Sequence, residues 1–168
     1  RLAERTLAMA RATSEDPASG LAPAELLGRF TGDLALYHSD VTEVSTEDRI
    51  KAARRAEEAA LATDPRIQNS EGAWYEASWG TKAYANSLGF AGSFRSSYCA
   101  ISVAPIAQDG GMQRDYWYSV ARRAGALESP ESVGRKAAER ALRKLGARKV
   151  STCRVPVVFD PETARSLL

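Results

Sequence analysis

The segment from Gln68 to Arg123 leaves few choices of fold, because it consists of β-type runs separated by tight turns. In its longest run, Cys99, Ile101 and Val103 fall on one face of an extended chain and the residues between them on the other. The segment therefore predicts an antiparallel meander. Its strands are expected at 68–79, 82–87, 90–108 and 112–122.

Glycine-containing turns punctuate the meander. Asp109-Gly110-Gly111 is the strongest hairpin signal in the chain, because glycine adopts positive φ without steric cost. Gly80-Thr81 and Leu88-Gly89 are weaker turn candidates. Pro105, near the end of the longest run, has no backbone N–H and predicts a sheet edge or a bulge there.

Helical patterns flank the meander. The helix expected at 45–63 begins at Ser45, with Asp48 placed as in a capping box, and has a thin apolar stripe of Ile50, Ala53, Ala60 and Leu61. The helix expected at 129–146 begins at Ser129-Pro130 and ends at Gly146, and its buried stripe is Val133, Ala137, Ala141, Leu142 and Leu145. Shorter helices are expected at 1–12, 23–28 and 162–168, and a strand at 148–159.

Composition indicates a globular α+β chain without a polyelectrolyte character. The chain has 168 residues, a net charge of +2 and no apolar run long enough to span a bilayer. Its two cysteines form no CxxC pair, which fits a reducing cytoplasm. Both ends lie inside helical patterns, so we expect a piece of a longer protein. Residues 1–44 would be the tail of a preceding domain with its connection, and 45–168 a central α+β domain truncated at its C-terminus.

The residues that could carry chemistry do not form a catalytic constellation. His38 is the only histidine and has no neighbours at metal-ligand spacing, so it is interpreted as a loop residue. Cys99 is interpreted as a buried strand residue and Cys153 as a bystander, although an enzyme using Cys99 remains a rival hypothesis. Gly110-Gly111 lacks the lysine and spacing of a phosphate loop. No catalytic, cofactor-binding or metal-binding residue is therefore predicted.

Two side-chain groups suggest binding rather than catalysis. A basic set could contact phosphates, which makes a nucleic-acid-binding module using 135–154 the alternative function, but a solvated helix face is favoured. It comprises Arg135, Lys136, Arg140, Arg143, Lys144, Arg148, Lys149 and Arg154. A dense group of aromatic residues belongs either to the core or to a groove for an extended peptide. It comprises Trp74, Tyr75, Trp79, Tyr84, Tyr116, Trp117 and Tyr118.

Several segments in order from about Ser45 to Leu168 resemble the TldD/PmbA family, also called the modulator of DNA gyrase family. They are Asn69-Ser70-Glu71-Gly72, Ala85-Asn86-Ser87 with Gly89-Phe90, Asp109-Gly110-Gly111 with Gln113-Arg114-Asp115-Tyr116-Trp117, Leu145-Gly146-Ala147-Arg148-Lys149 and Pro156-Val157-Val158-Phe159-Asp160-Pro161. The sequence Val158-Phe159-Asp160-Pro161 resembles the PmbA (TldE) branch more closely than the TldD branch.

The resemblance implies a cytoplasmic two-subunit metalloprotease that acts on unfolded peptides. In the TldD branch an HExxxH zinc motif follows the segment matched by 156–168, and this chain contains no such motif. The resemblance thus implies no cofactor in this chain, with zinc in a TldD-like catalytic partner subunit, and self-association as the other possible assembly. The expected function is a scaffold that shapes a peptide cavity, without nucleic acid or membrane as a partner.

Overall fold

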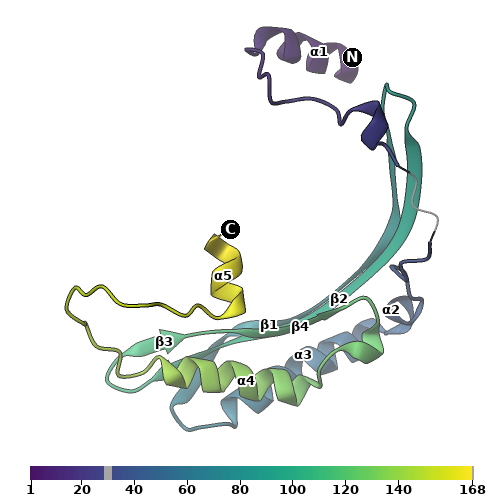
Figure 1. Cartoon of the computed structure of the whole chain (residues 1–168). Coiled ribbons are helices and arrows are strands. Elements are labelled where there is room, and N and C mark those ends of the chain that lie inside the picture. Colours follow the sequence, from purple (N-terminus) through teal and green to yellow (C-terminus); the bar gives the residue numbers. More distant parts are fainter. Residues whose placement is uncertain (29–31, 168) are drawn as a thin grey trace.

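The computed structural model describes residues 1–28 and 32–167, and it places four antiparallel strands in one sheet (Figure 1). Strand β2 (Ala91–Gln108) is central. On one side it pairs with β1 (Ile67–Ala85), and on the other with β3 (Met112–Arg114) and β4 (Trp117–Ala121). The predicted α+β class and the antiparallel meander are confirmed.

Helices α3 (Thr46–Leu61) and α4 (Pro130–Arg143) begin at the predicted caps. The Ser45 hydroxyl accepts a hydrogen bond from the Asp48 N–H at 3.1 Å, and the Ser129 hydroxyl accepts one from the Ser132 N–H at 3.2 Å. Helix α4 ends at Arg143 with Lys144 as its C-cap, so Gly146, with a φ of +69°, lies one residue beyond the C′ position that was predicted for it. The remaining helices are α1 (Leu2–Ala12), α2 (Asp40–Glu43), α5 (Pro161–Leu167) and the 3-10 turns η1 (Ala24–Leu26) and η2 (Ala124–Ala126).

Three predictions about strands were wrong. Gly80-Thr81 is not a turn, because Gly80 and Thr81 pair in register with Ser96 and Arg95 inside the long β1–β2 ladder. The expected strand at 112–122 is two strands, β3 and β4, which leave β2 residues 104–105 between their two ladders. Residues 148–159 form no strand within the described part of the chain.

Pro105 lies in that interval, where a missing backbone N–H costs the least. The prediction of an edge was wrong, since β2 is central. The prediction of a bulge was close, because the β1 register shifts between Ser70, which is opposite Pro105, and Ala73. Gly72, inside this bulge, has a φ of +119°.

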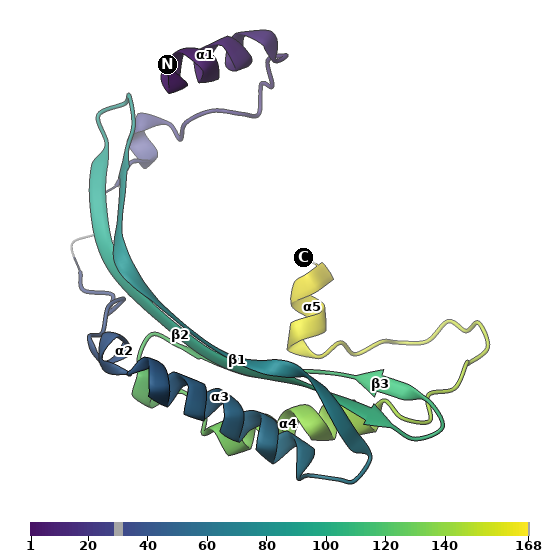
Figure 2. The same ribbon diagram turned by 180° about the vertical axis from the view of Figure 1, so that it is seen from behind.

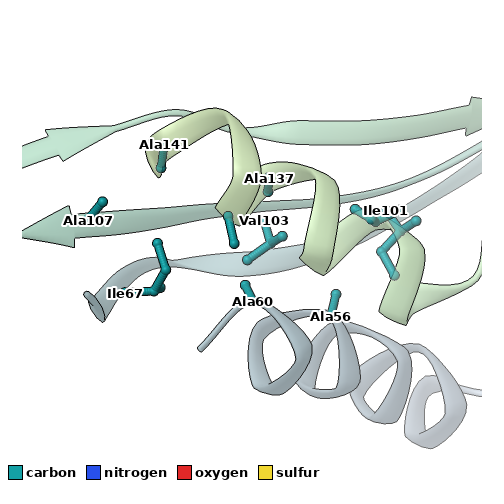
Figure 3. Packing of buried hydrophobic residues seen from close by; sticks show 10 residues of the cluster. Ala56, Ala60, Ile67, Ile101, Val103, Ala107, Ala137 and Ala141 are labelled. Atoms are coloured by element: carbon teal, nitrogen blue, oxygen red, sulfur yellow. The ribbon is translucent and has the colours of Figure 1, made fainter. Parts of the chain in front are cut away.

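The core lies between one face of the sheet and the pair of helices α3 and α4 (Figure 3). It is made mainly of small residues, because the two helices approach each other closely. The buried set is Ala56, Ala60, Ile67, Ile101, Val103, Ala107, Val133, Ala137, Ala138 and Ala141. The predicted stripe of α4 is confirmed, with Leu142 and Leu145 partly buried at its end. In the predicted stripe of α3, however, Ile50 and Leu61 are exposed.

The sheet is strongly curved, and α3 and α4 cover its convex side (Figures 1 and 2). The far ends of β1 and β2 continue beyond these helices as a two-stranded arm toward η1 and α1. The short helix α5 stands on the concave side. Residues 29–31, in the predicted connection, and Leu168, at the end of the predicted last helix, lie outside the described residues. No helix that the structure describes has the length and apolar character needed to cross a membrane.

Candidate functional site on the open face of the sheet

Helices α3 and α4 lie on the convex side of the sheet and leave the side chains of its concave face uncovered by either helix (Figures 1 and 2). Strand residues alternate between faces, and the residues opposite one another here are Trp74, Ser102 and Tyr118 in one row and Glu76, Ala100 and Val120 in the next. Ser78 and Tyr98 form a third row. We refer to these three rows as the open face.

Large aromatic side chains are exposed on this face. Trp74 is 47% exposed and Tyr98 38% exposed, and Tyr116, which precedes β4, is 51% exposed. The rings of Tyr116 and Tyr118 stack with centroids 6.1 Å apart. Large aromatic groups are normally buried or held at interfaces, because their burial contributes strongly to stability. The open face is therefore suited to contact another polypeptide.

The structure shows which of the aromatic residues belong to the core and which are on the concave side or the arm. Tyr75 and Trp117 pack against the core, on the helix side of the sheet. Trp74, Tyr116 and Tyr118 belong to the concave side. Trp79 and Tyr84 lie further along the arm, where the Arg49 guanidinium is 5.8 Å from the Trp79 ring and Tyr84 contacts Phe90. Tyr98 was missing from the candidate set, although its alternation with Cys99 placed it opposite the core.

Helix α5 borders the open face through Glu162. Its carboxylate acts as a hydrogen-bond acceptor and a negative charge beside Tyr118, and both effects raise the pKa of that phenol. The same carboxylate lies 3.7 Å from the Arg140 guanidinium of α4. Glu162 thus connects α5 with strand β4 and with helix α4.

The cysteine and histidine candidates occupy structural positions. Cys99 is buried, its thiol donates to the Ala121 carbonyl at 3.5 Å, and burial together with the Asp40 charge raises its pKa. A thiol in this environment stays protonated at neutral pH and is a poor nucleophile. His38 is half-buried. Its backbone N–H donates to the Ser97 hydroxyl at 2.9 Å, and its ring Nε2 lies 3.0 Å from the Ala35 carbonyl oxygen. Cys153 is exposed.

The described residues do not fit a metal centre. No group of three or more histidine, cysteine, aspartate or glutamate side chains within 1–28 and 32–167 is arranged to hold an ion. Gly110-Gly111 forms the tip of the β2–β3 hairpin, where the Asp109 N–H donates to the Gly111 carbonyl at 3.0 Å. This loop joins two strands rather than a strand and a helix, so the structure confirms a hairpin turn at this position.

A hollow of about 1330 Å³ lies along the arm, away from the open face, between residues 32–38 and the far ends of β1 and β2. The connection is held there by the Ser97 N–H, which donates to the Leu36 carbonyl at 2.9 Å. The Arg95 guanidinium also lies 3.7 Å from the centre of the Tyr37 ring. These contacts explain how 32–38 follows the arm without belonging to the sheet.

Ion pairs neutralise much of the basic set. Lys136 pairs with Glu128 at 2.7 Å, and Arg143 with Glu139 at 3.8 Å. Arg140 and Lys144 both approach the Asp115 carboxylate, at 3.4 and 3.1 Å. Arg140 also lies over the Trp117 ring. The ion pairs of Arg140 and Lys144 therefore fix the chain between β3 and β4. The structure gives no support to nucleic-acid binding by the basic set.

Asp115 makes this network sensitive to pH. Burial raises the pKa of its carboxyl, but the Tyr116 N–H, Lys144 and Arg140 together lower that pKa below its ordinary value. A depressed folded-state pKa stabilises the protein above the unfolded-state pKa near 4, and that stability is lost as pH falls through the folded value. We expect Asp115→Asn to reduce the free energy of unfolding by about 2 kcal/mol at pH 7.

Urea unfolding of both proteins between pH 7 and pH 2.5 checks this prediction. The difference between Asp115→Asn and the parent chain should shrink below pH 4. Glu15→Gln, which removes an exposed carboxylate without a side-chain partner among the described residues, should give no difference at any pH. A difference between Asp115→Asn and the parent that is constant over the whole pH range would contradict the assignment.

The antiparallel sheet with helices α3 and α4 on one face defines an α+β domain, and comparison with known proteins identifies its family. Residues 39–145 match the family described as the PmbA/TldA metallopeptidase central domain. The chain is 41% identical over 168 residues to the Metalloprotease PmbA of Escherichia coli O157:H7, covering 99% of the chain and 37% of that protein. It is 36% identical over 166 residues to the Metalloprotease PmbA homolog of Haemophilus influenzae, covering 98% of the chain and 36% of that protein.

Solved structures agree with this assignment. A protein from Bacteroides thetaiotaomicron, described as a candidate modulator of DNA gyrase, aligns with a TM-score of 0.73 at 29% identity, over 88% of this chain and 34% of its own. TldE from Thermococcus kodakarensis shares the fold, with a TM-score of 0.59 at 15% identity, over 83% of this chain and 30% of its own. The chain belongs to the PmbA/TldD family. It spans a little over a third of the length of the curated relatives that it matches.

Proposed function

We propose that this chain is the central scaffold of a PmbA-type peptidase subunit and that its open face lines a cavity for an extended, unfolded peptide. Residues 1–44 are the tail of a preceding domain, and 45–168 are a central domain that continues beyond this chain. Hydrolysis takes place on a zinc-bearing TldD-like partner subunit in the cytoplasm. A self-associated form of the same subunit is the other assembly that the proposal allows.

The observation that carries the proposal is the exposure of Trp74, Tyr98 and Tyr116 on the concave side of a sheet whose other face packs on α3 and α4. Aromatic rings contact many different side chains at a small cost in conformational entropy, which suits a site for unfolded peptides. Successive rows of the open face are two residues apart along each strand. In an extended peptide, every second side chain likewise points to the same side, so its side-chain repeat matches these rows. The names of the relatives, which are metalloproteases, support a proteolytic role for the whole protein.

Peptide hydrolysis by the natural subunit together with its TldD-like partner tests this proposal. Trp74→Ala combined with Tyr98→Ala should raise KM for an unfolded peptide by about 10-fold and leave kcat nearly unchanged, because uniform binding is lost. The matched control is Trp79→Ala, which removes a similarly exposed ring, 50% exposed, from outside the open face. Equal effects of the two changes, or none, would contradict the proposed cavity.

Metal analysis gives a second, independent test. The isolated 168-residue chain should bind no stoichiometric zinc after dialysis, because the described residues offer no ligand cluster. One tightly bound zinc ion per chain would show that the reaction centre lies inside this chain and would refute the scaffold role.

A further inference from the structure

The segment from Arg154 to Phe159 has the composition of a strand but lacks the partners of one. It lies between α4 and α5, and its side chains are exposed: Val155 60%, Val157 62%, Val158 96% and Phe159 50%. Among residues 1–28 and 32–167, the backbone of 147–159 makes no hydrogen bond. β-Branched and aromatic residues in such a run favour a pleated, partly buried strand. The segment therefore presents both apolar side chains and free backbone groups.

Pro156 determines which edge of this segment can pair. In a strand, the N–H and C=O groups of one residue point to the same edge, and successive residues point to opposite edges. Pro156 has no N–H, which weakens the edge that it shares with Arg154 and Val158. The opposite edge keeps all the donors and acceptors of Val155, Val157 and Phe159. Pairing is thus expected on this second edge only.

Helix α5 anchors the C-terminal end of the segment to the domain. Asp160 follows the segment directly, and its carboxylate accepts hydrogen bonds from the N–H groups of Glu162 at 2.9 Å and Thr163 at 3.2 Å. Glu162 in turn approaches Arg140 of α4. The end of the segment is therefore anchored to the domain, and the entropy cost of pairing it within one polypeptide is the modest cost of closing a loop.

We propose that residues 154–159 form an edge strand that pairs, through Val155, Val157 and Phe159, with a strand of the same polypeptide outside residues 1–168. This rests on the proposed function, in which the chain is part of a longer subunit. The matched relatives are long enough to supply that strand, since the chain covers only 37% of the E. coli protein. A second copy is a poorer occupant, because a six-residue strand falls far short of the 1,200 Å² or so that a stable interface buries.

Hydrogen exchange at single-residue resolution tests this inference on two proteins, the 168-residue chain and the uninterrupted natural polypeptide that contains it. The amides of Val155, Val157 and Phe159 should exchange on the order of 100-fold more slowly in the longer polypeptide, while Arg154 and Val158 should change little. The amides of Ile101 and Val103, at the centre of the sheet, report in both proteins that the domain is folded.

A pair of proline variants of the longer polypeptide makes the edge assignment specific. Val157→Pro removes a donor from the pairing edge and should abolish the protection of Val155 and Phe159. Val158→Pro, the matched control, removes a donor from the other edge and should preserve that protection. Equal effects of the two prolines would overturn the edge assignment.

Each other outcome of the exchange experiment also decides the question. Protection already present in the 168-residue chain, protection that requires a second subunit, or no protection in either protein would overturn the inference. So would a natural polypeptide that is no longer than 168 residues. Because the measurement needs no peptide, it stays independent of the open-face variants: a failure of those variants leaves the exchange result unaffected, and the reverse also holds.

Discussion

Replacing Gly134 by alanine is expected to lower the free energy of unfolding by about 3 kcal/mol, because α3 and α4 cross at this residue. A Cβ at Gly134 would overlap the Ala56 carbonyl oxygen and lie 2.9 Å from the Ala60 backbone nitrogen. Both are backbone atoms, so relief requires one helix to shift. Alanine favours a helix over glycine by only about 1 kcal/mol, which is too little to offset the clash.

Thermal unfolding measures this effect, and a loss of this size should lower Tm by about 6–12 °C for a chain of this length. Gly80→Ala is the matched control, because a Cβ there meets no atom within 4 Å and Gly80 lies in a regular part of the β1–β2 ladder. It should change Tm by much less. A Gly134→Ala protein as stable as the parent would mean that the helices do not cross as closely as the structure indicates.

The elements that the sequence predicted correctly are those with local causes. Ser45 and Ser129 form their cap hydrogen bonds within three residues of themselves. The hairpin at Asp109-Gly110-Gly111 depends on glycine conformations at the turn itself. Such features need no knowledge of distant contacts, which explains why their positions could be read before the structure was known.

The incorrect predictions have causes that lie far away in the sequence. Gly80-Thr81 carries a turn-forming residue, yet the partner strand at 95–96 keeps it extended. At the break between β3 and β4, Asp115 forms ion pairs with Arg140 and Lys144, which follow it by 25 and 29 residues. Gly134 gave no signal of its importance, because the sequence does not show that Ala56 lies against it. Tertiary contacts override local propensity at all of these positions.

The open face could be predicted only in part. Alternation separates Tyr98 from Cys99 and Trp74 from Tyr75, but it does not say which of the two faces is buried. That choice depends on the helices, whose small residues match the face of Ile101 and Val103. The ion pairs of the basic set could in principle be predicted, because Glu128, Glu139 and Asp115 supply the opposite charges. Only the structure showed that these carboxylates are close enough to form ion pairs with Lys136, Arg140, Arg143 and Lys144.

Ile101→Ala should lower the free energy of unfolding by about 3–4 kcal/mol, within the range observed for large-to-small changes in a packed core. Ile101 is 1% exposed and lies in the middle of β2, in the packed layer between the sheet and the two helices (Figure 3). The cavity that alanine leaves cannot collapse easily, because its other walls are two backbone ladders and the small residues of α3 and α4.

Val120→Ala is the control for this change, since Val120 lies on the neighbouring strand β4 with its side chain 48% exposed on the open face. Urea unfolding of the three proteins should show a loss for Val120→Ala below about 1 kcal/mol. If Ile101→Ala lost no more than this control, the helices would not pack firmly on the sheet in solution. The open face would then lack the rigid backing that a peptide cavity requires, so this stability measurement also bears on the proposed function.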